Sequence, residues 1–268
     1  MKIQLLSDLH LEQNIGFVPR PAPDADLLRC HPARHLDRLR AEAPEEGLAQ
    51  LDPDTWMSPG SLEAAWRAAG GVVAAVDAVA AGDLANAFVA ARPPGHHAEA
   101  ELPMGFCLLG NVAIGARRAL DHHGMGRVAV VDFDVHHGNG TQALLWDEGR
   151  ALFVSSHQMP LWPGSGAPGE RGAHGQILNL PLPPGSGGGL MRRLYAEKVF
   201  PRLREWRPEM ILVSAGFDAH AADPLAELEW QADDFAWLTG EICAIAAEVC
   251  GGRGGSALGG GHGLAALG

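Results

Sequence analysis

The sequence predicts one large α/β domain built on a mostly parallel sheet with helices on both faces. From about residue 60 onward, short runs rich in β-branched residues alternate with segments of helical character, which is the pattern of a parallel sheet. The chain has 268 residues, enough to bury a substantial core. Its residues are 47% hydrophobic and 19% charged, which is typical of a globular protein rather than a disordered one.

The expected elements follow one another in a regular order. The first is an alanine-rich helix at 61–82, with Ser61 as its N-cap and Gly82 as its terminator. A short buried strand at 86–91 follows and ends before Arg92. The later elements are a helix at 110–124, a β-branched strand at 127–134, a strand at 151–156, an amphipathic helix at 190–206 that Pro201 kinks, a strand at 210–218, a helix at 233–250, and a short strand at 255–263 that runs into a loop.

The segment 155–189 interrupts this alternation. It is rich in Gly and Pro and shows little periodicity, and a loop of this length in a compact domain is usually functional. The glycine-rich run at 185–190 lacks the Lys-Ser/Thr ending of a phosphate-binding loop, so we expect a flexible loop there.

Charge and cysteine content restrict the class of partner. The formal net charge of −12 disfavours nucleic acid and favours a cationic ligand. None of the four cysteines lies in a C-x-x-C pair, which indicates buried thiols in a reducing cytosol. We expect no signal peptide and no membrane-spanning stretch, and therefore a cytoplasmic protein with no membrane partner.

Ionisable side chains follow four of the expected strands. Ligands of an open α/β sheet bind outside the carboxyl ends of its strands, so these side chains should meet at one edge. They are His96 and His97 after the first strand, Asp132, Asp134 and His136 after the second, His157 after the third, and Asp218 after the fourth.

The residue types favour a metal site. Asp134 and His136 are two apart, so on an extended strand their side chains share a face. With a further aspartate they form an oxygen and nitrogen ligand set suited to a divalent transition metal with open positions. Asp132 falls on the same face and could be a ligand or a support for one. The adjacent His96 and His97 diverge too much to bind one metal together, and they suit general acid and base work.

Four motifs in a fixed order give the sequence a family resemblance. They are "RPPGHH" at 92–97, "GFC" at 105–107, "VDFDVHHGNGTQ" at 131–142 and "SAGFDAH" at 214–220. Together they resemble the histone deacetylase and acetylpolyamine amidohydrolase family, and Asn139 and the loop 155–166 are similar to its class II and bacterial members. The resemblance implies an arginase-like, three-layer α/β/α fold and removal of acyl groups from the amines of lysine or polyamines.

The same resemblance assigns the chemistry of the site. Asp134, His136 and Asp218 would hold one zinc ion per chain. His97 would be the general base and acid, and His96 would be its electrostatic partner. Asp132 would orient His96, and Asn139 would accept a hydrogen bond from His97.

Further residues would contact the substrate. Gly105 would offer its carbonyl near the leaving amine, and Phe106 and Trp162 would form the walls of an apolar tunnel for the acyl-lysine stem. Asp54 would contact the backbone of the substrate. Ser155 and Ser156 resemble positions whose backbone oxygens bind a structural potassium ion.

The C-terminal motif departs from the family. The catalytic tyrosine of the family lies in an "EGGY" motif, whereas "LGGGHG" at 258–263 puts Gly259 and His262 in its place. Loss of one oxyanion donor costs roughly 10²–10³ in turnover, so we expect weak activity on acetyl-lysine and make His262 a catalytic candidate. The alternative is a protein that binds acyl-lysine with little catalysis.

The first residues of the chain resemble another family. "MKIQLLSDLHLE" is similar to the first strand and D-x-H motif of calcineurin-like metallophosphoesterases, with Asp8 and His10 as ligands, but no G-N-H-[DE] motif follows. A phosphoesterase is thus a remote alternative. We expect residues 1–26 to be a foreign or displaced segment and residues 27–268 to be a deacetylase-like domain truncated at both ends. The sequence leaves the oligomeric state open.

Other histidines fall outside these motifs. His31 and His35 share a helical face and are expected at the surface. His122 and His123 precede Gly124 and are expected at a solvated helix end. His157 either supports the site or packs within its loop.

Overall fold

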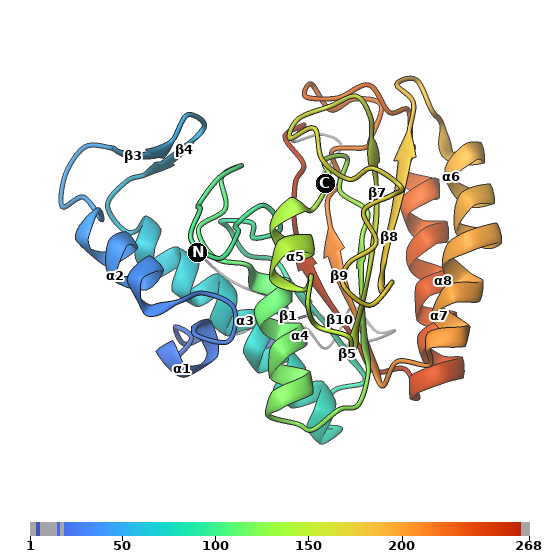
Figure 1. The fold of residues 1–268 in the computed structure, drawn as a ribbon, viewed down its shortest axis with the longest axis horizontal. Helices are drawn as coiled ribbons and strands as arrows, with labels where there is room; N and C mark the ends of the chain where they lie inside the picture. Colours follow the sequence, from blue (N-terminus) through green and yellow to red (C-terminus); the bar gives the residue numbers. More distant parts are fainter. Residues whose placement is uncertain (1–3, 6–14, 17–18, 264–268) are drawn as a thin grey trace.

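A parallel sheet forms the centre of the protein, as seen in a computed structural model that describes residues 4–5, 15–16 and 19–263 (Figure 1). Within these ranges the sheet has six strands in the order β5-β10-β9-β6-β7-β8, and every neighbouring pair is parallel. The strands are β5 (Asn86–Val89), β6 (Val128–Asp132), β7 (Ala151–Gln158), β8 (Ile177–Leu182), β9 (Met210–Ala215) and β10 (Gly254–Leu258).

Helices cover both faces of this sheet and make three layers (Figure 1). One face carries α3 (Ser61–Ala81), α4 (Asn111–Asp121) and α5 (Asn139–Leu144). The other carries α6 (Gly188–Leu194), a π-helical turn (Tyr195–Val199), α7 (Phe200–Trp206) and α8 (Ala232–Cys250). The predicted α/β/α architecture with a mostly parallel sheet is confirmed.

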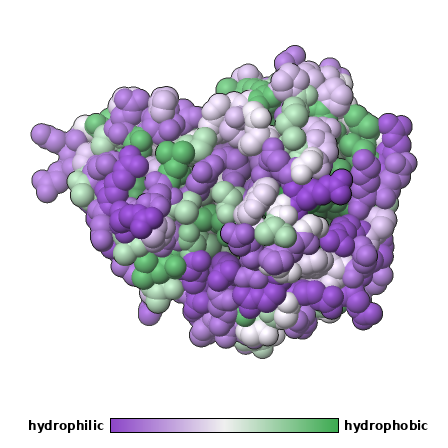
Figure 2. All heavy atoms as spheres, in the orientation of Figure 1, coloured by the Kyte–Doolittle hydropathy of each residue, from purple (hydrophilic) through white to green (hydrophobic). Residues whose placement is uncertain are grey.

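The central strand β6 shows why the sheet needs both layers. Val128 and Val130 pack into the core beneath α3 and α4, whereas Ala129 and Val131 pack into the core beneath α7 and α8. Side chains alternate between the two faces of a strand, so a strand covered on both sides is apolar throughout. The helices turn their polar sides outward, and Figure 2 shows a mostly hydrophilic surface in this view with smaller hydrophobic patches.

Helix α3 differs from its prediction in two ways. Its N-cap is Gly60, at φ 86°, and Ser61 is the first helical residue, while Gly82 ends the helix in the left-handed conformation as predicted. Its length and mean hydropathy of 1.3 also satisfy the criteria for a membrane span, which the sequence analysis did not expect. Most of that window is buried against β5, β10 and α4, which is the environment of a core helix.

Two elements near residues 155–206 were predicted incompletely. The segment 155–189 contains strand β8, which pairs with β7 at the edge of the sheet. Its sequence includes Pro181, which lacks a backbone donor and is tolerated only in edge strands, and this weakens the strand signal. The expected kink at Pro201 takes the form of the π-helical turn that directly precedes it.

The N-terminal part of the described chain packs against α3. The amide of Ala22 donates to the carbonyl of Trp66 over 2.9 Å, and Arg67 donates to the carbonyl of Pro19 over 2.8 Å. The expected boundary after residue 26 therefore falls inside α1 (Asp24–Leu27), whose Leu27 is fully buried. Asp8 and His10 lie outside the described residues.

The remaining elements are small. Helix α2 (Ala33–Ala41) follows α1, and an antiparallel hairpin is formed by β3 (Ala49–Asp52) and β4 (Thr55–Met57). A short pair is formed by β1 (Gln4–Leu5) and β2 (Ile15–Gly16). Among the described residues no cysteine forms a disulfide, and Cys243 is exposed on α8, contrary to the expectation that all four are buried.

The surface position expected for His31 and His35 is wrong. Both are only 1% exposed, and their rings stack with centroids 4.7 Å apart. His31 bonds the carbonyl of Ala100 through Nδ1 and accepts from the amide of Gly110 through Nε2, and His35 bonds the carbonyl of Leu108. The pair therefore holds both ends of the loop 100–110. His122, by contrast, is exposed just beyond the end of α4, as predicted.

Burial makes His31 a determinant of acid stability. Desolvation, together with the charge of His35, lowers the pKa of His31 from 6.5 to about 4. Between pH 6.5 and pH 4, His31 is protonated in the unfolded chain but stays neutral in the folded one. The free energy of unfolding therefore decreases as the pH falls from 6.5 towards 4. Between pH 7 and pH 5 this loss is roughly 2 kcal/mol. We predict that His31→Gln loses correspondingly less stability over this interval than the parent, as measured by urea unfolding at both pH values.

The exposed His122→Gln serves as the control for this experiment. We expect it to show the pH dependence of the parent. An identical pH dependence for His31→Gln and the parent would mean that the buried imidazole is not the acid-sensitive group.

Candidate active site

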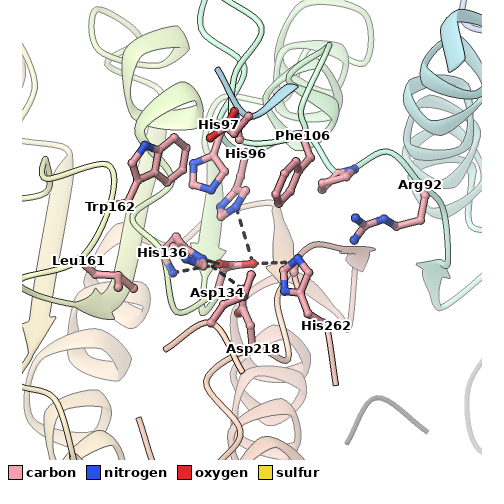
Figure 3. A pocket seen from close by; sticks show the side chains of 15 residues that line it. Arg92, His96, His97, Phe106, Asp134, His136, Leu161, Trp162, Asp218 and His262 are labelled. Atoms are coloured by element: carbon pink, nitrogen blue, oxygen red, sulfur yellow. Dashed lines mark hydrogen bonds and ion pairs between the residues drawn. The ribbon is translucent and has the colours of Figure 1, made fainter. Parts of the chain in front are cut away.

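A cavity of about 220 Å³ lies at the carboxyl ends of the sheet strands (Figure 3). Its base is formed by residues that follow β6 and β9, and its walls by the loops after β5, β7 and β10. The predicted site residues among its lining are Asp54, His96, His97, Gly105, Phe106, Asp134, His136, Trp162, Asp218 and His262. The lining residues that sequence reasoning missed are Arg92, Pro94, Leu161, Leu225 and Gly260.

Asp134, His136 and Asp218 converge at the base of this cavity. Nδ1 of His136 lies 3.2 Å from Oδ1 of Asp134 and 3.2 Å from Oδ2 of Asp218. Ligand atoms around a tetrahedral zinc with bonds of about 2.0–2.2 Å are separated by roughly 3.3–3.5 Å. The spacing of the three side chains thus fits one small divalent ion.

The charges of this cluster also fit a cation. Both aspartates are fully buried, and burial together with the charge of Asp134 raises the pKa of Asp218 to about 7. Burial alone would lower the pKa of His136, but the two carboxylates outweigh it and raise the value to about 10. Two buried carboxylates beside one imidazole repel each other unless positive charge compensates them, and a bound metal ion would supply that charge.

Backbone donors hold the carboxylates in place. The amide of Gly260 donates to Oδ2 of Asp134 over 2.7 Å, and the amide of Val135 donates to Oδ1 of Asp218 over 3.0 Å. A Cβ atom at Gly260 would overlap Oδ2 of Asp218, so only glycine allows the loop after β10 to come this close.

Asp132 forms a hydrogen bond with His96 and is not one of the three side chains of the metal cluster. Its Oδ2 accepts from Nδ1 of His96 over 3.0 Å, and its Oδ1 accepts from the amide of Asp134 over 3.1 Å. Both oxygens are thereby used, and the group of potential ligands at this site is Asp134, His136 and Asp218.

His96 and His97 have opposite proton affinities. Burial lowers the pKa of His96, but Asp134 and Asp132 outweigh burial and raise it to about 9. Burial and the charge of His96, whose ring centroid is 3.8 Å away, hold the pKa of His97 well below its usual value. Nδ1 of His97 donates to Oδ1 of Asn139 over 2.8 Å, which leaves Nε2 unprotonated. His97 is therefore a neutral base beside a charged neighbour.

Phe106 and Trp162 flank the cavity near its mouth (Figure 3). Their side chains are 43% and 41% exposed, and the ring of Trp162 lies 4.7 Å from that of His97. Two exposed aromatic groups on either side of a cavity provide apolar walls for a ligand stem.

Hairpin β3–β4 shapes the Phe106 wall. Gly105 and Phe106 have φ angles of 57° and 64°, and this left-handed conformation is costly for phenylalanine. Oδ1 of Asp54 accepts from the amide of Gly105, and Oγ1 of Thr55 accepts from the amide of Phe106, each over 3.0 Å. The carbonyl of Gly105 accepts from the thiol of Cys107 over 3.3 Å. Thr55 was missed because its role depends on a chain segment 51 residues away.

His262 lines the cavity on the side opposite Trp162 (Figure 3). Its amide donates to Oδ2 of Asp223 over 2.7 Å, and both ring nitrogens are buried without a hydrogen-bond partner among the described residues. The single tyrosine of the sequence, Tyr195, is buried elsewhere and bonds Ser156 over 2.8 Å. No phenol can therefore reach the cavity, and His262 is the side chain at the expected position.

His157 supports the loop that carries Trp162. It bonds Oγ of Ser155 over 3.0 Å and the carbonyl of Gly166 over 3.1 Å, and it is fully buried. This resolves the open interpretation of His157 in favour of a role within the loop. The hydroxyls of Ser155 and Ser156 are engaged with His157 and Tyr195, and the potassium site at their backbone oxygens stays a prediction.

A second group of side chains that could bind a metal lies away from the cavity, but its surroundings suit a cation less well. Asp77, His122 and His123 lie within reach of one another at the ends of α3 and α4. Both oxygens of Asp77 already accept from Arg118, over 2.9 and 3.0 Å. A guanidinium in this position repels a metal ion.

Comparisons with known proteins agree with this geometry. A profile of the histone deacetylase domain matches residues 2–268. The chain is 44% identical over 237 residues to a histone deacetylase-like amidohydrolase of Pseudomonas aeruginosa, covering 87% of this chain and 62% of the relative. It is 38% identical over 254 residues to a probable deacetylase of Archaeoglobus fulgidus, covering 94% of this chain and 70% of the relative.

A solved structure is also similar. The crystal structure of the HDA15 HD domain matches with a TM-score of 0.88 and 31% identity, covering 94% of this chain and 71% of that one. This chain thus spans less than two thirds of the Pseudomonas relative and somewhat more of the other two.

The cluster geometry predicts metal content. We expect one divalent ion per chain in the parent and strong loss of that ion in Asp218→Ala, because the variant removes one of three ligands. Elemental analysis after dialysis measures both. His97→Ala is the matched control and should keep its metal, since His97 bonds Asn139 and lies outside the ligand group. Full stoichiometry in Asp218→Ala would remove the assignment.

Proposed function

Because the chain belongs to the histone deacetylase family, we propose that it is a zinc-dependent deacylase that hydrolyses the amide bond of an acylated lysine or polyamine. The observation that carries the proposal is the placement of a neutral His97 over a cluster of two carboxylates and one imidazole in the same cavity. Such a pairing of metal ligands and a positioned base is typical of metal-assisted hydrolysis.

Asp134, His136 and Asp218 would hold the zinc ion. When bound, zinc lowers the pKa of a coordinated water to about 7 and polarises a carbonyl oxygen. The buried carboxylates supply the negative charge that such an ion requires.

His97 would move the proton. Its Nε2 accepts a proton from the attacking water and then returns it to the nitrogen of the leaving amine. Asn139 keeps the ring oriented through Nδ1 during both transfers. The charge on His96, fixed by its bond to Asp132, favours negative charge that develops on the acyl group.

The cavity walls would bind the amine part of the substrate. Phe106 and Trp162 contact the methylene stem of a lysine or polyamine, and the carbonyl of Gly105 lies where it can accept from the leaving amine. Asp54, which lines the cavity near Gly105, favours a cationic or amide-bearing substrate there.

His262 supports a second candidate function. An imidazole in place of a phenol donates poorly to the carbonyl of an ordinary acetyl group. Within the described residues the ring nitrogens of His262 make no hydrogen bond, and the nearest charged group is Asp223, whose Oδ1 lies 3.9 Å from Nδ1. A catalytically weak protein that binds acyl-lysine is therefore the alternative. Turnover of an activated substrate separates the two candidates.

His97→Ala should abolish turnover and retain the metal. Loss of general acid and base catalysis costs roughly 10²–10⁴ in rate, which steady-state kinetics on a trifluoroacetyl-lysine peptide would detect. Asn139→Ala is the graded comparison, because it frees the ring of His97 without removing it, and it should lose less. Loss of metal from His97→Ala would show that the division of roles is wrong.

His262→Tyr should raise acetyl-lysine turnover by roughly 10²-fold, because it restores an oxyanion donor. The rate on trifluoroacetyl-lysine should rise less, since its activated carbonyl needs less help. Side-by-side kinetics of the parent and the folded, zinc-loaded variant provide the test. An unchanged acetyl-lysine rate would mean that residue 262 does not reach the reacting carbonyl.

A further inference from the structure

Arg92 is a charged cavity residue that the proposed mechanism does not use. It is half-buried, and Figure 3 shows its side chain extending towards the space between Phe106 and His262. Its one hydrogen bond within the described residues joins Nη1 to the carbonyl of Gly259 over 3.2 Å, and no described carboxylate pairs with it. The half-buried Arg118, by contrast, is paired with both Asp77 and Asp26.

Most of the hydrogen-bond donors of Arg92 have no protein partner among the described residues. A guanidinium carries five N–H donors, and one backbone carbonyl uses only one of them. A partly buried charge without a counter-charge is unfavourable, so a ligand that brings a carboxylate gains a charge-assisted, bidentate partner. The cavity therefore contains a preformed anion-binding group.

The position of Arg92 relative to the metal cluster defines which part of a substrate it reaches. Its partner Gly259 is followed by Gly260, whose amide donates to Oδ2 of Asp134. Only this short piece of backbone separates the guanidinium from the cluster. Gly259 has no side chain and stands where the family motif has glutamate, so this segment offers Arg92 no carboxylate of its own.

The charges around the cavity favour an anionic group at one end of the substrate over the other. The amine side of the cavity carries Asp54, which bonds Gly105 and repels an anion there. Arg92 lines the cavity on the side of Gly259 and His262, where the only described acidic residues in the lining are those of the metal cluster. Asp223 also contacts His262, but it is buried outside the lining and its carboxylate accepts from the amides of His262 and Gly263. An anionic group on the acyl part of the substrate therefore meets attraction, and one on the amine part meets repulsion.

We infer that Arg92 forms a subsite for a carboxylate at the end of the acyl group, so that the substrates are amides of short dicarboxylic acids such as succinyl-lysine. The inference rests on the proposed deacylase function and specifies its acyl group. Water adds its oxygen to the amide carbonyl carbon, the C–N bond breaks, and the amine leaves with the proton that His97 carries. The products are the free dicarboxylate and the protonated amine.

This subsite also offsets the absent tyrosine. Binding energy from a remote part of a substrate can lower the barrier at the reacting carbonyl by fixing its orientation. A carboxylate held by Arg92 would place the carbonyl against the metal cluster, whereas an acetyl group has no such anchor.

The first experiment compares acyl groups on one peptide. The zinc-loaded parent is assayed with acetyl-, butyryl-, succinyl- and trifluoroacetyl-lysine, butyryl being the uncharged partner of succinyl. We expect kcat/KM for succinyl to exceed that for butyryl by roughly 10- to 100-fold, the range of a hydrogen bond to a charged group. Arg92→Gln should abolish this preference, Arg92→Lys should keep part of it, and the exposed Arg193→Gln should preserve it.

A second experiment measures binding without turnover. Zinc-loaded His97→Ala, which lacks the base and should keep its metal, is titrated with fluorescent succinyl- and butyryl-lysine peptides. The succinyl preference should appear in this variant and disappear when Arg92→Gln is added. If no peptide is hydrolysed, including trifluoroacetyl-lysine, the proposed function fails while the binding preference still tests the subsite. If trifluoroacetyl-lysine is hydrolysed but succinyl has no advantage, or Arg92→Gln keeps the advantage, the inference is wrong and the deacylase function stands.

Discussion

The mutual repulsion of two buried carboxylates governs the functional end of this protein. Strands β6 and β9 are parallel neighbours in register, so the residues that follow them, Asp134 and Asp218, meet around His136. Burial and like charge make this cluster unfavourable on its own, as the raised pKa of Asp218 records. Backbone amides from the loop after β10 and from the segment after β6 offset part of the cost, and a bound cation would offset the rest. Glycine at 260 lets its amide approach Asp134, because a Cβ atom there would overlap Oδ2 of Asp218.

The proton affinities of the histidine pair follow from the same charges. Asp134 and Asp132 favour the protonated form of His96, and the charge on His96 then disfavours protonation of His97. A neutral imidazole with a fixed tautomer is what a general base requires. The metal cluster and the base are thus two consequences of one buried acidic group, which explains why they lie at the same strand ends.

The sequence allowed prediction of those features that depend on local pattern. The apolar β-branched run of β6 and the spacing of Asp134 and His136 are visible within ten residues. They predicted the parallel sheet, and they predicted side chains that the structure brings together at its edge. Features that depend on distant partners were missed. His31 and His35 are buried because backbone groups 69 to 79 residues away accept or donate to their rings. Strand β8 is stabilised by its edge position beside β7, which its own proline-containing sequence does not indicate.

The position of Arg92 shows how one residue can carry both a structural and a selective function. Its bond to Gly259 fixes the start of the loop that delivers Gly260 to Asp134, so the guanidinium is anchored by the same loop that shapes the metal cluster. An anchored donor loses little conformational entropy when it binds a ligand. A carboxylate bound there restrains the acyl chain relative to the cluster, and that restraint acts on the step in which the amide is attacked. Selectivity for the acyl group and orientation of the carbonyl would then have one physical origin, the rigid connection between Arg92 and Asp134 through two glycines.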